Sequence, residues 1–232
     1  MLAQTVKRIG HRAGIEISRY RPASARRIHL LREVGVKTVF DVGANRGQYG
    51  AALRASGYDG TILSFEPLAD TFAKLEARTR LDNDWSVYRL ALGEDDGEAV
   101  LNVASKSGSS SLLPMRREHQ AGCPNAIMIG IETIRVARLD ALDLSVQPPA
   151  LLKLDVQGYE DRVLLGSVKT LRHVGLIECE LSLDQLYEGQ ATFRRMIDLL
   201  GDHGFEIIDL DPFFYDKTDG RVLSIDAMFR RE

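Results

Sequence analysis

The sequence predicts an α/β fold: a doubly wound, mostly parallel sheet of seven strands with an antiparallel final strand and a basic helical extension at the amino terminus. From Lys37 onward, short apolar segments alternate with segments of helical spacing, which is typical of parallel sheets covered by helices on both faces. Near the end of the chain, residues 205–210 and 222–230 read as two strands joined by a polar turn at 216–220. An antiparallel final pair departs from the layout of dinucleotide-binding folds.

The composition is that of one globular domain. The chain has 232 residues, 44% of them hydrophobic, which is enough to bury a full core, and we expect an extension over 1–35 and a domain over 36–232. A charged content of 27% and a net charge of −3 do not indicate a nucleic-acid partner. The two cysteines and the lack of a long apolar run favour a reducing, cytoplasmic location.

The first 32 residues differ in charge from the rest. They carry eight Lys or Arg against one acid, so their net charge of +7 leaves −10 for the other 200 residues. Leu2, Val6 and Ile9 recur at helical spacing among basic residues. Such a helix either packs on the edge of the sheet or contacts an anionic membrane or an acidic partner. A second helix is expected from Pro22 to Leu31.

The first strand leads into a glycine-rich loop. The strand ends at Asp41, and the loop has the pattern Asp-x-Gly-x-Asn-x-Gly, with Gly43, Ala44, Asn45 and Gly47, before a helix over 48–56. Glycine permits close backbone approach and positive φ angles. A carboxylate at the strand end repels phosphate and favours a cationic or hydroxyl-bearing ligand.

A second acid follows the next strand. Residues 60–65 end at Glu66-Pro67, and Glu66 lies nineteen residues after Gly47, about where such folds place a carboxylate on ribose hydroxyls. Pro67 suits the first turn of the expected helix over 68–80. A ligand with an adenosine ribose, a positive centre and no phosphate is S-adenosylmethionine, which is the predicted cofactor.

The third strand completes the expected cofactor site. It is predicted over 85–92, and the small apolar pair Ala91-Leu92 at its end suits an adenine ring. Ligands of doubly wound sheets bind at the carboxyl ends of the strands. Asp41, Glu66 and Ala91 should therefore converge at one edge.

Residues 94–137 interrupt the alternation. Extra strands are expected over 98–103 and 127–136, and the serine-rich segment 105–125 between them is expected to be a lid that faces the substrate, or else a mobile linker. We expect His119 in this segment to be a solvated residue without a catalytic role.

Acidic residues recur where the alternation resumes. Lys153 and Asp155 share a face near the end of the strand over 150–155, and Glu178 and Glu180 share a face of the strand over 174–181. Charges in buried parallel strands need a partner or a function. Glu180 lies nearer the carboxyl end and is favoured over Glu178. A helix over 191–203 follows.

Taken together, the motifs resemble the FkbM family of S-adenosylmethionine-dependent methyltransferases over about residues 36–230. The motifs that carry the resemblance are Phe40-Asp41-Val42-Gly43-Ala44-Asn45 with Gly47, Phe65-Glu66-Pro67, Ala91-Leu92-Gly93, Ser109-Ser110-Ser111-Leu112, Arg138-Leu139-Asp140-Ala141-Leu142, Lys153-Leu154-Asp155-Val156-Gln157-Gly158-Tyr159-Glu160 and Glu178-Cys179-Glu180-Leu181. Gln157 stands where the family pattern usually has glutamate. The resemblance implies a class I methyltransferase fold and O-methylation, often of sugar, glycolipid or polyketide hydroxyls.

These residues suggest a mechanism. A carboxylate can accept the proton of an acceptor hydroxyl as methyl transfer proceeds. We expect Asp155 to be this base, with Glu180 as the second candidate, Lys153 holding Asp155 ionised and Glu160 lining the acceptor pocket. Asp155, Glu160 and Glu180 are oxygen ligands of the kind that divalent cations prefer, but no histidine–acid spacing indicates a metal site.

Three other functions stay open. An NAD-dependent oxidoreductase suits the fold but not the first loop or the final hairpin. A nucleic-acid methyltransferase suits the basic amino terminus, whereas the domain itself is acidic. A non-catalytic adenosine-binding module needs Asp41 and Glu66 but not Asp155 or Glu180. A small-molecule or glycolipid acceptor, no nucleic acid, and peripheral membrane contact through the amino terminus are the expected partners.

Overall fold

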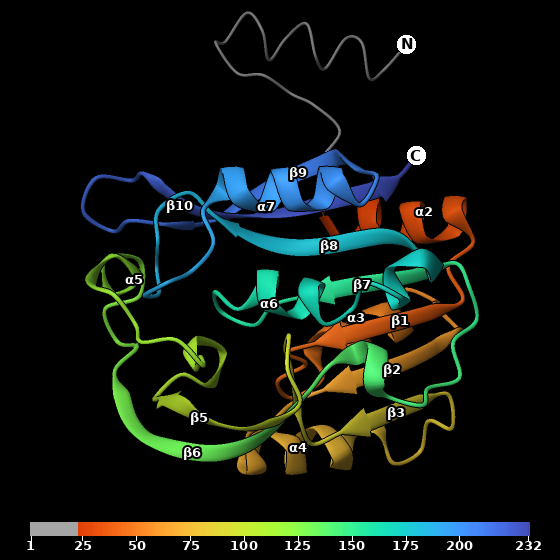
Figure 1. Cartoon of the computed structure of the whole chain (residues 1–232), viewed down its shortest axis with the longest axis horizontal. Coiled ribbons are helices and arrows are strands. Elements are labelled where there is room, and N and C mark those ends of the chain that lie inside the picture. The colour runs from red at the N-terminus through yellow and green to blue at the C-terminus, as the bar shows by residue number, and fades with distance from the viewer. Residues whose placement is uncertain (1–22) are drawn as a thin grey trace, which may run out of the picture.

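A computed structural model describes residues 23–232 of the chain, which form a central sheet between two layers of helices (Figure 1). The seven strands of this sheet lie in the order β3-β2-β1-β7-β8-β10-β9. Their bounds are β3 Trp85–Tyr88, β2 Thr61–Phe65, β1 Thr38–Val42, β7 Ala150–Leu154, β8 Val174–Ser182, β10 Val222–Arg231 and β9 Phe205–Tyr215.

The strand directions confirm the predicted sheet. The first five strands in this order pair in parallel, and β10 pairs antiparallel with both β8 and β9. Every residue of β1 and β7 is buried, because helices cover both faces of the parallel part. This explains why these strands read as apolar runs in the sequence.

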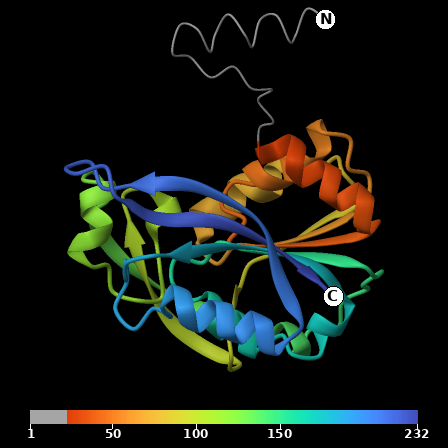
Figure 2. The same cartoon turned by 90° about the horizontal axis from the view of Figure 1, so that it is seen from above.

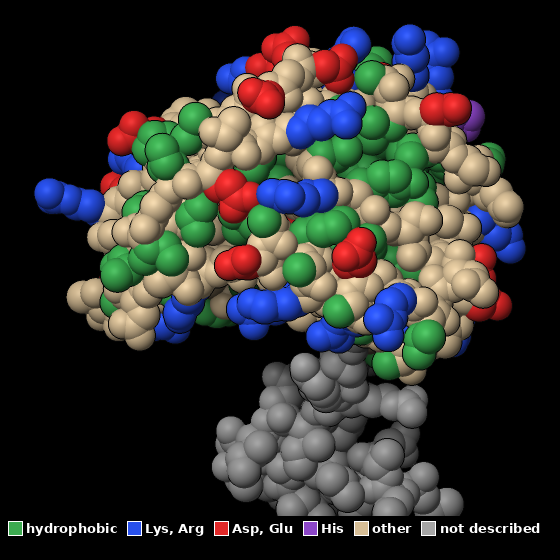
Figure 3. Space-filling view, turned by 90° about the horizontal axis from the view of Figure 1, so that it is seen from below, with side chains coloured by type: hydrophobic (Ala, Val, Ile, Leu, Met, Phe, Trp, Pro, Cys, Tyr) green, Lys and Arg blue, Asp and Glu red, His purple; other side chains and the backbone are tan. Residues whose placement is uncertain are grey.

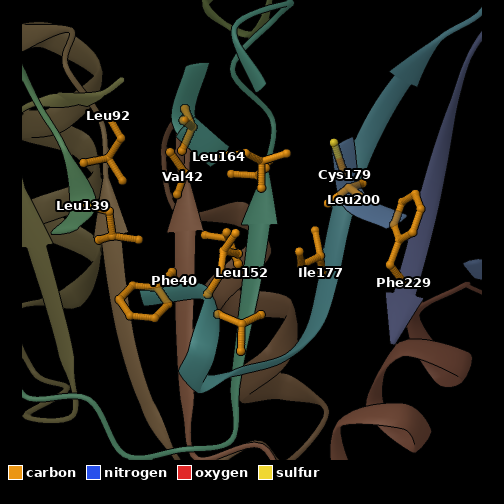
Figure 4. Close-up of a cluster of buried hydrophobic side chains, with 14 of the residues drawn as sticks. Phe40, Val42, Leu92, Leu139, Leu152, Leu164, Ile177, Cys179, Leu200 and Phe229 are labelled. Carbon is orange, nitrogen blue, oxygen red and sulfur yellow. The ribbon is translucent and has the colours of Figure 1, made fainter. Parts of the chain in front are cut away.

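The helices divide between the two faces. One face of the sheet is covered by α2 (Ala23–Val34), α3 (Gln48–Ala55) and α4 (Ala69–Thr79), and its apolar side chains belong to one core cluster. The other face is covered by α6 (Glu160–Leu165) and α7 (Phe193–Asp202), and its apolar side chains belong to a second core cluster. Figure 2 shows α2 in orange-red and α7 in blue on opposite sides of the sheet. The larger core lies under α6 and α7, where Phe40, Leu152 and Ile177 of neighbouring strands point to the same side (Figure 4).

A second, three-stranded sheet accounts for residues that the alternating pattern does not. It has the order β4-β6-β5, with β4 Ala91–Leu92, β5 Gly97–Ala104 and β6 Met128–Ala137. The extra strands predicted from the sequence are therefore confirmed. The prediction of one strand over 85–92 is wrong: β2 ends at Phe65, the register partner of Tyr88, and the chain then turns so that Ala91 pairs with Val136 instead.

The segment between β5 and β6 is ordered against the rest of the domain. It contains the short helices η1 (Ser107–Ser109) and α5 (Arg117–Gly122); two further short helices, η2 (Leu139–Ala141) and η3 (Thr170–His173), precede β7 and β8. The prediction of a solvated His119 is wrong, because the residue is 3% exposed and its ring packs against Tyr187 and Phe214. Burial lowers the pKa of His119 to about 4, so this side chain is neutral at physiological pH.

The part of the chain before the sheet is described only from Ala23. The predicted second helix is present as α2, and Arg27 of α2 forms an ion pair with Glu178 of β8. The amphipathic helix predicted around Leu2, Val6 and Ile9 lies outside the described residues, and the boundary at residue 35 stays a prediction. Within 23–232, we find no helix with the length and hydrophobicity needed to cross a membrane.

Candidate active site

One face of the central sheet changes from apolar to polar along the direction of the parallel strands. Beneath α2 and α3, Val39, Leu151 and Leu176 are followed two residues later by Asp41, Lys153 and Glu178, because alternate residues of a strand share a face. The strand register adds Ser64 beside Asp41, and Asp226 beside Glu180. Polar side chains from five strands, four of which supply charged groups, are thus gathered at the carboxyl end of the parallel sheet.

Lys153 links two of these acids. Its Nζ atom lies 3.2 Å from Asp41 Oδ1 and 3.4 Å from Asp155 Oδ2, and it donates to the carbonyl oxygen of Gly43 at 3.3 Å. Burial alone would lower the pKa of Lys153, but the charges of Asp155 and Asp41 outweigh it and raise the pKa. Lys153 therefore keeps its positive charge.

Asp41 lies beneath the glycine loop and not at a cavity wall. It is fully buried, its Oδ2 accepts from Ser64 Oγ at 3.2 Å, and Ser64 accepts from Trp85 Nε1 at 2.9 Å. Burial raises the pKa of Asp41. The sequence prediction places Asp41 against the cofactor, whereas this geometry gives it no direct access and lets it act through Lys153.

The glycine loop passes close to the end of β7. Gly43 has φ +75°, and a Cβ atom there would lie 1.9 Å from the carbonyl oxygen of Asp155, so only glycine fits. Gly47 fills a different role, because a Cβ atom there would lie 2.8 Å from Leu75 of α4. Gly47 thus packs the loop onto α4 and contacts neither cavity described below.

Glu66 is held by the same loop. Its Oε2 accepts from the backbone N–H of Asn45 at 3.0 Å, and its Oε1 accepts from the N–H of Leu68 at 2.9 Å. Burial raises the pKa of Glu66 to about 7. Each carboxylate oxygen has a lone pair left for a further donor.

A cavity, here called cavity A, opens between the ends of β1, β2 and β4 and the segment after β5. Much of its wall is apolar, and its two acidic residues are Glu66 and Asp155. It is lined by Val42, Gly43, Asn45, Phe65, Glu66, Pro67, Leu90, Ala91, Leu92, Leu101, Ser107, Gly108, Ser110, Leu112, Asp155, Val156, Gln157 and Tyr159. Residues predicted from three separate strand ends thus meet in one place, and segment 105–125 supplies part of the wall.

A second cavity, cavity B, adjoins cavity A and has a volume of about 380 Å³. It is lined by Arg27, Gly43, Ala44, Asn45, Gln48, Tyr49, Ala52, Gly108, Lys153, Leu154, Asp155, Glu178, Glu180 and Asp226. Gly43, Asn45, Gly108 and Asp155 line both cavities. Asp155 is the carboxylate at their junction, and its side chain is 45% exposed.

The acids of cavity B differ in how far they are already bonded. Glu178 is held by Arg27 and accepts from the Tyr49 hydroxyl at 2.6 Å, so it is engaged in structural contacts. Glu180 accepts from Ser224 Oγ at 2.8 Å and from Gln157 Nε2 at 3.1 Å. Burial, with the nearby charge of Asp155, raises the pKa of Glu180 well above its ordinary value. The preference for Glu180 over Glu178 as a site residue stays a prediction.

Glu160 stabilises the turn after β7. Its Oε1 accepts from the backbone N–H groups of Val156 at 3.0 Å and Gly158 at 3.2 Å, and it lines neither cavity. Burial raises the pKa of Glu160 to about 7. The predicted contact with the acceptor is therefore absent from this geometry, and Glu160 shapes the loop that carries Gln157.

Two residues of the site, Asp226 and Tyr187, were not predicted from the sequence. Asp226 faces cavity B from β10, next to Glu180, and burial raises its pKa to about 7. An acid inside an otherwise buried strand was a usable signal, the same one that indicates Glu180. Tyr187 bonds to Gln157 from a loop, and no local pattern marks it.

The distribution of surface charge concerns nucleic-acid binding, and the arrangement of the acidic side chains concerns metal binding. On the face in Figure 3, basic and acidic side chains are interspersed, unlike the one-sided positive charge of nucleic-acid-binding surfaces. Among residues 23–232, no group of three or more His, Cys, Asp or Glu side chains is arranged to hold a metal ion.

Known proteins similar to this chain include methyltransferases. The 2-O-methyltransferase NoeI of Sinorhizobium fredii is 23% identical over 204 residues, which cover 83% of each chain. The antimetabolite synthetase AmbE of Pseudomonas aeruginosa is 27% identical over 215 residues, covering 78% of this chain but 10% of AmbE. The structure of magnesium protoporphyrin IX methyltransferase ChlM from Synechocystis PCC 6803, with bound S-adenosylmethionine, superimposes with a TM-score of 0.50 at 12% identity and covers 99% of this chain and 83% of ChlM.

A family match settles the class of enzyme. Residues 41–207 match the family described as Methyltransferase FkbM domain, which is most of the chain. The predictions of an S-adenosylmethionine-dependent methyltransferase and of its family are thereby confirmed, against the oxidoreductase and the non-catalytic module. The chain belongs to the FkbM methyltransferase family.

Proposed function

We propose that this enzyme methylates a hydroxyl group of a sugar, a glycolipid or another hydroxylated natural product that binds in cavity B. The observation that carries the proposal is the place of Asp155, at the junction of an apolar cavity and a polar one, with Lys153 beside it. A partly exposed carboxylate at this junction can reach both the cofactor side and the acceptor side.

Cavity A fits S-adenosylmethionine. The apolar wall at Ala91 and Leu92 suits an adenine ring, the free lone pairs of Glu66 suit ribose hydroxyls, and the missing Cβ of Gly43 lets the backbone approach closely. Asn45 and Pro67 complete the same wall, and Ala44 lies on the side of cavity B. When bound, the cofactor supplies an electrophilic methyl group on a sulfonium centre.

The protein contributes alignment and a proton acceptor. Holding two reacting centres in line can supply about 7–11 kcal/mol of the barrier. Asp155 accepts the proton of the acceptor hydroxyl as its oxygen is methylated, and the ammonium group of Lys153 stabilises the negative charge of Asp155 before transfer. The carboxyl oxygens of Glu180 and Asp226 can accept hydrogen bonds from other hydroxyl groups of the bound substrate.

The acceptor class rests on the chemistry of cavity B and on one relative. Four acidic side chains face the cavity beside Lys153 and Arg27, and their oxygen atoms can accept hydrogen bonds from the hydroxyl groups of a neutral acceptor. NoeI is by its name a 2-O-methyltransferase. A cytoplasmic location, and membrane contact through the basic amino terminus when the acceptor is a glycolipid, remain parts of this proposal.

Two measurements test the proposal. A thermal-shift comparison of S-adenosylhomocysteine with NADH should show stabilisation by the first alone, about 2.7 kcal/mol at a hundred times its dissociation constant. Methyl-labelled S-adenosylmethionine is then supplied with a panel of neutral glycosides, glycolipids, sugar phosphates and oligonucleotides. Label on hydroxyl oxygens of the neutral acceptors supports the proposal, and label confined to the phosphorylated or nucleic-acid acceptors overturns it.

A further inference from the structure

We infer that Gln157 is a positioning residue, which holds the carboxylates of Asp155 and Glu180 in fixed places on the two sides of one neutral amide. The inference rests on the proposed function in one respect only, namely that Asp155 is the base. The contacts that define this arrangement belong to the protein itself.

The donors of Gln157 match the two acids. Its Nε2 atom donates to Asp155 Oδ1 at 2.8 Å and to Glu180 Oε2 at 3.1 Å. A side-chain amide has two N–H donors, so both are used and each carboxylate receives one. The amide brings the two acids together without adding a charge.

The amide is held in this orientation from its other end. The hydroxyl of Tyr187 donates to Gln157 Oε1 at 2.8 Å, and Tyr187 is 1% exposed, with the ring of His119 against it. A flipped amide would turn its oxygen toward both carboxylates and leave three acceptors without a donor. The two acids therefore favour the orientation in which the amide N–H groups face them, and Tyr187, whose hydroxyl also lies 3.2 Å from the carbonyl oxygen of Ser109, supplies the donor for Gln157 Oε1.

The backbone of Gln157 is also held in an unusual conformation. Its φ angle is +56°, in the left-handed region that costs a non-glycine residue free energy. Ser111 Oγ donates to the carbonyl oxygen of Gln157 at 2.6 Å, and Glu160 binds the N–H groups on either side of it. The serine-rich segment and Glu160, which the mechanism does not use directly, thus have a role in placing Gln157.

The test compares the titration of Glu180 in four full-length proteins by ¹³C NMR of the carboxyl groups, with Glu180→Gln used to assign the signal. Asp155 at the end of β7, Glu160 of α6 and Asp226 of β10 also raise the pKa of Glu180, and none of these three residues is substituted in the variants that are compared. Gln157→Met removes both donors at similar size. The control is Gln190→Met, because Gln190 is a buried glutamine that bonds to Ser182 and to the backbone N–H groups of Leu186 and Tyr187, but to no carboxylate.

In Gln157→Met the titration midpoint of Glu180 should rise by about one to two pH units, since the lost bond favours the charged form. Tyr187→Phe should move it in the same direction by less, because the amide stays but can rotate. Gln190→Met should leave it in place. A midpoint in Gln157→Met equal to that of the wild type overturns the inference, because a merely structural glutamine would lower stability without moving this titration.

Gln157→Glu gives a second measurement that does not depend on a cavity-forming substitution. When protonated, the new carboxyl group can donate one hydrogen bond, and when ionised it places a third negative charge beside the two acids. The titration midpoint of Glu180 should therefore be higher in Gln157→Glu than in the wild type, because the added negative charge favours the protonated form of Glu180. A midpoint in Gln157→Glu equal to that of the wild type overturns the inference.

The outcomes separate this inference from the proposed function. If S-adenosylhomocysteine fails to bind, the proposed function fails, while the midpoint of Glu180 still decides the role of Gln157. If Asp155→Asn keeps its turnover and Gln157→Met shifts the midpoint, the positioning role stands and the assignment of the base falls.

Discussion

Lys153 and Asp41 form an ion pair of 3.2 Å in the middle of the sheet, where their side chains are 9% and 0% exposed. A buried ion pair is weak evidence of net stability, because removing both charges from water offsets their attraction. Loss of one partner, however, leaves the other charge uncompensated. The same lysine contacts Asp155, so this pair connects the interior of the sheet to the candidate active site.

We expect Lys153→Met to lower the free energy of unfolding by about 3–5 kcal/mol at pH 8, because Asp41 is then buried without its partner. Urea denaturation at constant pH measures the change. The double variant Asp41→Asn/Lys153→Met should regain part of the loss. Equal stability of the single and double variants would show that Asp41 does not depend on the charge of Lys153.

Asp155→Asn should keep the affinity for S-adenosylhomocysteine but lower methyl-transfer turnover by about a hundredfold or more, the usual scale for one acid–base group. Calorimetry and label transfer measure the two properties separately. Asp59→Asn is the control, since Asp59 is an exposed acid away from both cavities. Turnover near that of the wild type would remove Asp155 from its role.

Gly43→Ala should abolish cofactor binding and destabilise the fold by about 3 kcal/mol or more, because the new Cβ meets the carbonyl of Asp155 and φ is +75°. Gly130→Ala is the matched control, since a Cβ atom there meets nothing within 4 Å. It should stay within about 0.5 kcal/mol of the wild type. Thermal denaturation with and without S-adenosylhomocysteine measures both the stability and the binding of this ligand. A Gly43→Ala variant that binds S-adenosylhomocysteine normally would contradict the close approach of the Gly43 backbone to the cofactor.

Asp226→Asn should stabilise the protein at pH 8 and leave its stability at pH 4 nearly unchanged. Burial raises the pKa of Asp226 to about 7, above the value of about 4 in the unfolded chain, so its contribution is fully present below about pH 4 and is lost as pH rises through about 7. The free energy of unfolding at pH 8 should rise by at most about 4 kcal/mol in this variant. Unfolding curves at pH 4, 6 and 8 test it, with Asp59→Asn as the control; a gain of equal size at all three values would exclude titration as its cause.

Much of the fold could be predicted because local patterns and global structure agree. The apolar runs of β1 and β7 indicate a parallel sheet covered on both faces, and the polar turn at 216–220 indicates the final hairpin. The turn after Tyr88 could not be read from the sequence, because the apolar pattern continues to Leu92 while β2 already ends at Phe65. Where a strand ends depends on its neighbour as well as on its own residues.

The candidate site divides in the same way. Gly43, Glu66 and Asp155 were found because each directly follows, or nearly follows, a recognisable strand. The role of Gln157 depends on Tyr187, thirty residues away, and the burial of His119 depends on a loop that folds back against it. Such contacts between distant segments leave no periodic signal in the chain.

The two cavities differ in which parts of the chain build them. Every residue that lines cavity A falls within the stretch 41–207 that defines the family, whereas Arg27 of α2 and Asp226 of β10 close cavity B from outside it. The lining of cavity A is therefore part of the stretch that the family shares, whereas cavity B also depends on elements beyond that stretch. Under the proposed function, substitutions in α2 and β10 could change the preference for the acceptor without altering a residue that lines cavity A.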